Sequence, residues 1–519
     1  MVRRRAALSL ASLPCVLFAG VTAAQQPPPE AEQPRGLVTH EAGAFEGYTL
    51  FAPLRSHATV LVDMDGHVVH RWPGTLDPSA VYLLDDGSLL RSVRIEPNKT
   101  FQGGGICGRV ERVAWDGTTV WSYDLANEDQ TSHHDAFPMP NGNVLLIAWE
   151  FRYREDVLAA GRAPDKTPDK GFWPDALLEV KPTPPSGGEI VWEWHVWDHL
   201  VQDTDRELDH YGSVADSPGR IDINADHRDA PAMSAEELEK QKELEEQMRA
   251  LGYSGGGDEE DDAPTAPATA PAAGSPAAAA LANGPGSDWL HVNGVAYDPV
   301  HDLVMLSTPN FSELWIVDHS TTTEQAASDR GGKHGHGGDL LWRWGNPSNY
   351  GAGTAADRRL FFQHNPQWIA QGLPGAGHVL VFNNGQGRPG GEHSSVDELE
   401  LPLDAQKGFQ REPGKPFGPA APVWSYSAPE PASFYGSFIS GCQRLPNGNT
   451  MICEGPKGRL FEVTPSGKIV WEYWNEHGGD STSTDNAGGV DAKALFRATR
   501  IAPDHPALKG RKLEPEATR

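Results

Sequence analysis

The feature that most constrains this chain is a β-hairpin that recurs along it. Pro-Asn-Gly-Asn stands between two apolar runs at residues 140–143 and again at 446–449. Asn-Gly supplies the positive-φ positions that a tight strand reversal requires. A third copy reverses at Asp86-Gly87, and looser copies occupy 290–298 and 362–375. The sequence therefore predicts five related hairpins.

A second repeated unit alternates with these hairpins. It consists of a strand, a Gly-containing turn and a strand that ends in tryptophan, and it occurs six times, at residues 60–72, 109–123, 177–194, 314–344, 396–426 and 459–473. One hairpin and one tryptophan unit give four strands, the content of one propeller blade. Five blades are therefore predicted, at 79–123, 132–194, 290–344, 362–426 and 437–473.

A sixth blade requires the unpaired N-terminal unit at 48–72 and one strand from the other end of the chain. Residues 494–501 are the candidate, and this pairing would close the ring and remove its exposed strand edges. The predicted fold class is all-β, a six-bladed β-propeller over residues 45–202 and 287–502 with an acidic, Ala/Pro-rich insertion.

Four segments lie outside the repeat. Residues 1–24 combine an arginine-rich start, a short apolar run and small residues, the pattern of a secretory signal peptide, so we expect a periplasmic or secreted protein. Composition predicts a disordered lead-in at 25–44, a mostly disordered insertion at 203–286 and a C-terminal tail at 503–519. No segment after the signal is long and apolar enough to span a membrane.

Charge and cysteine content limit the partners. The formal net charge is −28 and no basic cluster stands out, so nucleic acid is not an expected partner. Signal removal leaves Cys107, Cys442 and Cys453. Cys442 and Cys453 are equally distant from the turn at 447–448, which permits a disulfide across an unslipped hairpin. Two small buried thiols are the alternative reading.

The hairpin repeat also carries a candidate site. Eight residues before the turn glycine, the close copies hold Ser79, His134 and Ser440, and the looser copies offer His291 and His364. Innermost strands of a propeller line its channel, so these side chains should form a ring near one mouth. His133 lies one residue off and is expected to point into the sheet packing.

The strands that follow return to the same mouth with further polar residues. They carry Glu150, Arg152, Asn310, Asn383, Asn384 and Arg388. Imidazoles, amides and a guanidinium suit an oxyanion, because arginine offers a bidentate fork and histidine donates a hydrogen bond or accepts a proton. The histidines show no metal-binding spacing such as HxH or HExxH, so neither metal nor cofactor is expected.

Three stretches, at residues 288–294, 362–365 and 382–388, resemble the arylsulfate sulfotransferase family, six-bladed periplasmic propellers that move a sulfuryl group between phenols. The resemblance implies an aryl sulfate and a phenol as small-molecule partners. It implies that His291, His364 and Arg388 hold the sulfate, with His291 or His364 serving proton transfer. His134 completes the catalytic candidates, and the substrate-binding candidates are Asn293, Asn365, Asn383, Asn384, His393, Ser440 and Tyr435.

The resemblance also implies a nucleophilic histidine ahead of an aromatic-Tyr step, but residues 430–438 contain no histidine. His134 or His393 could take that role, transfer could be direct, or the pocket could bind without chemistry. Three functions therefore stay open: a sulfuryl transferase, a non-catalytic binding or scaffold propeller, and a quinoprotein-like oxidoreductase. The third ranks last because eight blades and adjacent cysteines are not predicted. The sequence does not decide the oligomeric state.

Overall fold

A computed structural model of the chain describes residues 33–95, 98–101, 103–226, 286–404, 406–478 and 493–516. The chain divides into two compact units, Met1–Pro34 and Arg35–Arg519, and the second holds all the elements below. The predicted signal peptide at 1–24 lies outside the described residues, as do residues 227–285 of the predicted insertion.

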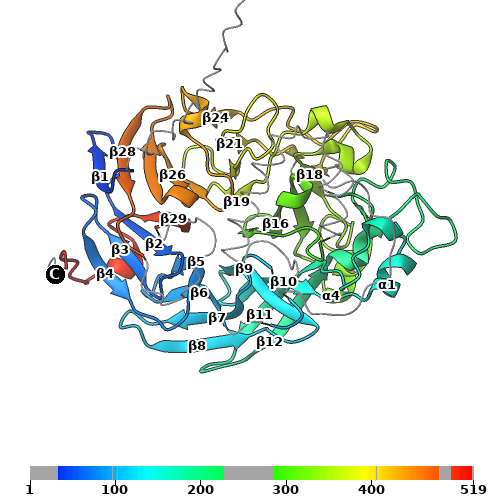
Figure 1. The fold of residues 1–519 in the computed structure, drawn as a ribbon, viewed down its shortest axis with the longest axis horizontal. Helices are drawn as coiled ribbons and strands as arrows, with labels where there is room; N and C mark the ends of the chain where they lie inside the picture. The colour runs from blue at the N-terminus through cyan, green and yellow to red at the C-terminus, as the bar shows by residue number, and fades with distance from the viewer. Residues whose placement is uncertain are drawn as a thin grey trace, which may run out of the picture. The chain divides into compact units, whose positions relative to one another are not determined.

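Six sheets follow one another around a common centre (Figure 1). Blade 1 contains β29 (Leu495–Ile501), β2 (Tyr48–Pro53), β3 (Thr59–Val62) and β4 (Val68–Trp72). Blade 2 contains β5 (Pro78–Leu83), β6 (Leu89–Arg94), β7 (Gly108–Val113) and β8 (Thr119–Asp124). Blade 3 contains β9 (Gln130–Pro138), β10 (Val144–Glu150), β11 (Asp175–Pro182) and β12 (Gly188–His195).

The other three blades complete the ring. Blade 4 contains β15 (Gly294–Asp298), β16 (Leu303–Thr308), β17 (Glu313–Asp318) and β18 (Trp342–Trp344). Blade 5 contains β19 (His364–Trp368), β20 (Val379–Asn383), β21 (Ser395–Leu399) and β24 (Trp424–Tyr426). Blade 6 contains β25 (Gly441–Arg444), β26 (Thr450–Glu454), β27 (Arg459–Val463) and β28 (Ile469–Trp474).

Strand β29 closes the ring as the repeat predicts. It pairs antiparallel with β2, with Tyr48 opposite Ile501 and Pro53 opposite Leu495. The first and last strands of the propeller therefore share one sheet, and the prediction of a six-bladed β-propeller is confirmed. Within the described residues, no helix is both long and apolar enough to cross a membrane.

The repeated tryptophan joins five of the six blades to the next, the exception being Trp72 of blade 1. The indole N–H of Trp121 in blade 2 donates to Gly187 O of blade 3 at 2.8 Å, and that of Trp192 in blade 3 donates to Thr321 Oγ1 of blade 4 at 3.1 Å. The same link recurs from Trp342 to Gly418, from Trp424 to Pro465 and from Trp471 to Met64. A large apolar side chain with one donor thus fills the space between blades and donates to an oxygen of the next blade, a backbone carbonyl in four cases and the Thr321 hydroxyl in the fifth.

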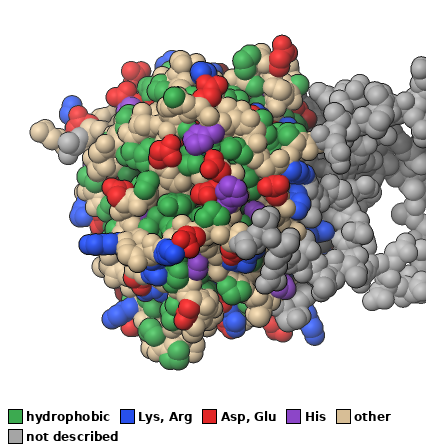
Figure 2. All heavy atoms as spheres, turned by 90° about the vertical axis from the view of Figure 1, so that its left-hand side faces the viewer, with side chains coloured by type: hydrophobic (Ala, Val, Ile, Leu, Met, Phe, Trp, Pro, Cys, Tyr) green, Lys and Arg blue, Asp and Glu red, His purple; other side chains and the backbone are tan. Residues whose placement is uncertain are grey.

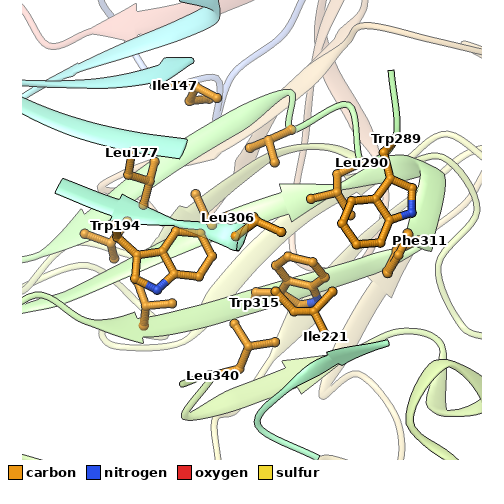
Figure 3. Close-up of a cluster of buried hydrophobic side chains, with 14 of the residues drawn as sticks. Ile147, Leu177, Trp194, Ile221, Trp289, Leu290, Leu306, Phe311, Trp315 and Leu340 are labelled. Atoms are coloured by element: carbon orange, nitrogen blue, oxygen red, sulfur yellow. The ribbon is translucent and has the colours of Figure 1, made fainter. Parts of the chain in front are cut away.

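Apolar side chains between blades 3 and 4 form a large core cluster (Figure 3). Ile221, from the short strand β14 (Ile221–Asp222), packs in it with Trp315. Strand β14 pairs with β13 (Leu200–Val201). Residues 203–226 therefore have defined structure, although composition placed them in a disordered insertion. Their few apolar side chains reach a core that only the fold assembles.

The predicted lead-in and tail also contribute structure. Strand β1 (Gly36–His40) pairs with β28 and gives blade 6 a fifth strand, so the predicted disorder at 25–44 is wrong for these residues. In the tail, Ala507 and Leu508 are buried against blade 1.

On the outer side of the ring drawn in Figure 2, acidic and basic side chains are interspersed.

The disulfide prediction is wrong. Cys442 pairs with Ile452, and Gly441 pairs with Cys453, so the two cysteines are one register step apart. All three described cysteines are free and buried. The turn spans Leu445 to Asn449 and contains an odd number of loop residues. A one-residue slip sends neighbouring side chains to opposite faces of the sheet.

Candidate functional site

Three of the predicted slot residues lie in strained backbone on or just before the inner strands. His134 has φ 52°, His291 has φ 56° and Ser440 has φ 89°. In blade 5 the positive φ falls on Phe362 and Asn365, on either side of His364. Non-glycine residues seldom adopt this conformation, and it concentrates at functional sites. The slots of blades 3, 4 and 6 thus share a backbone feature, which blade 5 has beside its slot.

Two slot histidines are in contact, and the third is within electrostatic range of both. The imidazole centroids of His134 and His291 are 4.5 Å apart at 76°, an edge-to-face contact. His364 lowers the pKa of His134, and its own pKa is lowered by His291. None of the three is more than 4% exposed. The structure therefore brings together the histidines that the hairpin repeat placed in equivalent positions.

His291 is held by an aspartate from its own loop. Its Nδ1 and Asp288 Oδ2 form a short hydrogen bond, and Asp288 is three residues earlier in the chain. In the neutral tautomer that this contact favours, Nδ1 carries the hydrogen and Nε2 carries the lone pair. An imidazole oriented in this way is suited to act as a nucleophile or base.

His134 is held by a second histidine that sequence reasoning left out of the site. The Nδ1 atoms of His133 and His134 are 2.8 Å apart, and His133 Nε2 lies 3.0 Å from Asp175 Oδ1 on β11. The ring of His133 stacks on Trp149 at 4.1 Å. His133 is packed within the blade, as period-two alternation predicts, yet it links His134 to a buried carboxylate. The adjacent His-His pair was the available signal.

His364 makes two contacts that fix its tautomer. Its Nδ1 lies 2.8 Å from Asn384 Oδ1, and its Nε2 accepts from the Ile439 N–H at 3.2 Å. The Asn384 amide nitrogen donates to the carbonyls of Gly436 and Ile439, which orients its oxygen toward the ring. Asn384 is therefore a positioning residue for His364 and ties blade 5 to blade 6.

Burial keeps these imidazoles neutral. It lowers the pKa of His133 and of His134 well below the usual range, and the neighbouring His291 lowers both further. Burial also lowers the pKa of His364, to about 3, although Asn384 opposes the change. Uncharged imidazoles of this kind can accept or pass on a proton at neutral pH.

The arginine in electrostatic contact with His134 and His364 is Arg497, which the sequence did not single out. It comes from the closing strand β29, where its guanidinium pairs with Asp135 and hydrogen-bonds to Tyr82 Oη at 2.9 Å. Burial disfavours its charge, but Asp135 and Tyr82 raise its pKa above the usual value. No local motif marks it, because its partners are in other blades.

The predicted arginine, Arg388, has a different setting. It is half-buried, its guanidinium packs over Phe361 at 5.4 Å, and its Nη2 donates to Ser395 Oγ at 3.0 Å. Arg358 packs over the same ring at 4.6 Å. Burial lowers the pKa of both arginines. Arg388 thus shares an aromatic platform with a second arginine that the sequence did not identify.

Most of the predicted binding amides support the backbone. Asn293 donates to Gln363 O, Asn365 accepts from Cys442 N–H, and Asn383 donates to Arg359 O. Ser440 accepts from Gly455 N–H. Each contact joins two blades or closes one hairpin, so these side chains shape the inner strand ends.

Two predicted residues lie on loops and are half-buried. His393 Nδ1 lies 2.8 Å from Gly391 O, and the Tyr435 N–H donates to Glu454 at 3.1 Å. Burial raises the pKa of Tyr435 far above its usual value, so its hydroxyl stays protonated. The structure gives neither residue a contact with the three slot histidines.

A polar cavity of ≈ 250 Å³ lies apart from the slot histidines, none of which lines it. Asn310, on the 3₁₀ turn η4 (Pro309–Phe311), lines it and donates to the carbonyl of Trp289 at 3.2 Å. Arg358 lines it as well. In the part of the chain that the structure describes, no group of three or more His, Cys, Asp or Glu is arranged to hold a metal ion.

Comparison with known proteins identifies relatives. The family model described as arylsulfotransferase (ASST) matches residues 55–482. The chain is 24% identical over 433 residues to arylsulfate sulfotransferase AssT of Escherichia coli O6:H1 (strain CFT073), an alignment that covers 78% of this chain and 58% of that protein. The chain therefore spans less than two thirds of the length of this curated relative.

Solved structures are more distant. A protein of unknown function from Bacteroides caccae is 11% identical, with 87% of this chain and 98% of that chain covered and a TM-score of 0.41. Virginiamycin B lyase from Staphylococcus aureus is 8% identical, with 86% and 85% covered and a TM-score of 0.33.

Proposed function

The chain belongs to the arylsulfotransferase family, and from that premise we propose that it transfers a sulfuryl group from an aryl sulfate to a phenolic acceptor. The proposed site is the histidine cluster, formed by His133, His134, His291 and His364. The observation that carries the proposal is the edge-to-face contact of His134 and His291 at 4.5 Å, with Asp288 on the His291 ring and Asp175 linked to His134 through His133.

His291 is the proposed nucleophile in place of the histidine missing from residues 430–438. Asp288 holds its Nδ1 hydrogen, so the Nε2 lone pair can attack sulfur. The N–S bond forms as the donor S–O bond breaks, and the bond electrons leave with the aryl oxygen. The acceptor oxygen then attacks sulfur, and the N–S electrons return to His291. Such covalent catalysis divides one difficult transfer into two easier ones.

Arg388 is proposed to hold the sulfate oxygens as the donor enters, as the family resemblance implies. Its half-buried guanidinium and that of Arg358 both pack on Phe361. Arginine binds such oxyanions through paired hydrogen bonds. The proposed location is the periplasm or the exterior, for which the charged and apolar pattern of residues 1–24 is the support.

A non-catalytic binding propeller is the second candidate. Residues 430–438 lack the histidine that the family resemblance implies as nucleophile, and a pocket that had lost this group could still bind an aryl sulfate. This candidate predicts donor binding without turnover, whereas the transferase candidate predicts turnover that depends on a phenolic acceptor.

The test is release of a chromogenic phenol from an aryl sulfate by the mature protein, with and without a second phenol. We expect acceptor-dependent release, a sulfuryl adduct on a His291-containing peptide when no acceptor is present, and loss of both in His291→Ala. His393→Ala is the matched variant, because it removes the loop histidine. If His393→Ala loses the adduct and His291→Ala keeps it, the assignment of the nucleophile is wrong. Donor binding without release would favour the binding propeller.

A further inference from the structure

Behind His134 lies a chain of two buried groups, Asp175 and His133, with no assigned part in the transfer. Asp175 Oδ1 is 3.0 Å from His133 Nε2, and His133 Nδ1 is 2.8 Å from His134 Nδ1. The separation of Asp175 from His133 is that of a hydrogen bond, although the two groups are not aligned as one. Catalytic contacts of this kind often tighten only when substrate binds.

The contact between the two Nδ1 atoms couples the tautomers of the two histidines. Only one of two facing nitrogens can carry the shared hydrogen while both rings are neutral. In the first state, the shared hydrogen is on His133 Nδ1. His133 Nε2 can then accept a proton from Asp175, and His134 carries its own hydrogen on Nε2. In the second state, the shared hydrogen is on His134 Nδ1. His133 then carries its hydrogen on Nε2, facing the Asp175 carboxylate, and His134 Nε2 carries the lone pair.

From this coupling we propose that Asp175 and His133 form a two-state proton relay behind His134, which supplies the leaving phenol with its proton and recovers it from the acceptor. The inference rests on the proposed function and adds two positioning residues to it. Asp175 and His133 act through His134, the one relay group that would touch the reacting oxygen.

The surroundings favour the proton-loaded state at rest. Asp175 is fully buried, Asp288 and Glu150 are the nearby carboxylates, and the Val292 N–H donates to it at 3.2 Å. Burial and the Asp288 carboxylate raise the pKa of Asp175 well above its usual range. His134 faces His291, His364 and Arg497, which disfavour a positive charge on it. When Asp175, His133 and His134 are all uncharged, the buried site contains neither an isolated carboxylate nor an imidazolium.

The proton balance follows both half-reactions. As the donor S–O bond breaks, the aryl oxygen takes the bond electrons and the Nε2 hydrogen of His134. The Nδ1 hydrogen of His133 then moves to His134, and the Asp175 proton moves to His133 Nε2, which leaves a carboxylate. When the acceptor phenol attacks sulfur, its proton enters at His134 Nε2 and the same shifts run backward. Both imidazoles remain neutral in each state.

The test is Asp175→Asn, which keeps the shape of the side chain but has no proton to give. We compare the phenol released in the first turnover from two donors, one with a good leaving group such as nitrophenol and one with a poor leaving phenol. The poor leaving group needs its proton, so its release should slow by about 10²- to 10⁴-fold, the usual range for lost general-acid catalysis. The nitrophenol donor should slow less than about tenfold.

Asp318→Asn is the matched control, since Asp318 is also buried but lies in blade 4 on the outer turn of β17. Equal slowing of the two donors by Asp175→Asn would indicate a structural role and would overturn the relay. Wild-type protein without acceptor-dependent release would instead overturn the proposed function.

A second measurement does not require turnover. In protein labelled with ¹⁵N-histidine, the Nδ1 and Nε2 shifts of His133 and His134 report which nitrogen carries hydrogen. We expect both rings to be neutral and to exchange tautomers together as rising pH ionises Asp175, with no such exchange in Asp175→Asn. Independent switching of either ring, no switching, or an imidazolium at neutral pH would overturn the relay.

Discussion

The hairpins of blades 3 and 6 share a turn and differ in chemistry. In both, two asparagines of the Asn-Gly-Asn turn donate to one glutamate on the next strand: Asn141 and Asn143 to Glu179, and Asn447 and Asn449 to Glu462. The turn backbone bonds also match, from Met139 to Asn143 and from Leu445 to Asn449. The outer half of each hairpin thus has the same construction.

The two hairpins differ at their inner ends, in the contacts that their slot residues make. Ser440 accepts from Gly455 N–H at 3.0 Å and donates to Phe438 O at 3.2 Å, so it closes its own blade. His134 contacts His133 and His291 and connects blade 3 to blade 4. The turn therefore builds the blade, while the slot at the far end of the strand is free to carry a reactive group.

Substitution of the slot residue in blade 3 should have the largest effect on kcat, and substitution of the slot residue in blade 6 a small one. His134→Ser places the blade 6 residue in blade 3 and removes the proposed proton donor, so kcat for acceptor-dependent phenol release should fall by about 10²-fold or more. Ser440→Ala removes only backbone contacts and should change kcat less than about threefold. Comparable losses in the two variants would contradict the division between a structural and a reactive slot.

A slot that holds a histidine should make stability depend on pH, whereas the serine slot of blade 6 should not. The pKa of His364 is about 3 in the folded protein and about 6.5 when unfolded. The unfolded chain binds more protons between these values, so the stabilising effect is complete above about pH 6.5 and declines as pH falls toward 3. From pH 7 to 5, His364 should account for about 2 kcal/mol of lost unfolding free energy.

Urea denaturation of wild type and His364→Asn at several pH values measures this difference. His133 and His134 act in the same direction, whereas the raised pKa of Asp175 acts in the opposite direction. The variant should show a shallower decline between pH 7 and 5. Parallel curves would mean that His364 is not held neutral by burial.

A glycine beside a slot histidine and a glycine in the outer turn should respond differently to substitution by alanine. Gly105 has φ 75°, and a methyl group there would overlap the imidazole of His134. Gly142 has φ 86° in the outer turn and open space around it. Gly142→Ala should cost about 1 kcal/mol of backbone strain and leave kcat unchanged. Gly105→Ala should cost about 1–3 kcal/mol more and reduce kcat, as thermal unfolding and phenol release would show.

The smallest effect concerns the shared turn. Glu179→Gln and Glu462→Gln each remove a charged acceptor and should cost about 1–3 kcal/mol of unfolding free energy without a change in kcat. Burial opposes ionisation of Glu179, but His319, Asn143 and Asn141 lower its pKa to about 2. Its contribution is therefore present above about pH 4.5 and lost as pH falls toward 2. A change in kcat would show that turn and slot are coupled.

Sequence reasoning reached the blades and three histidines of the cluster because both depend on local repetition. The Asn-Gly turns and tryptophan steps recur along the chain, and the closing strand at 494–501 followed from one blade lacking a partner. His134, His291 and His364 were found by their common distance from a turn. The predicted pairing of Cys442 with Cys453 was wrong because it assumed a loop with an even number of residues. The loop has an odd number, which shifts the pairing of β25 and β26 by one residue.

The remaining site residues had no such signal. Arg497 pairs with Asp135 across 362 residues of sequence, and Asp175 reaches His133 from the opposite side of its blade. Tautomer and charge depend on which groups surround a ring, so neither could be assigned from residue type alone. Arg388 was identified by resemblance, but its contacts with Phe361 and Ser395 became visible only in the fold.

Local sequence patterns were enough to predict the six blades, the joining of the chain ends and the positions of the three slot histidines. These follow from strand alternation, turn chemistry and spacing, which act over about ten residues at a time. The tertiary structure alone decided which carboxylate stands behind each imidazole, which arginine lies near them and how dry the site is. Those properties arise from burial and from contacts between blades, and a linear pattern does not encode which distant side chains will meet.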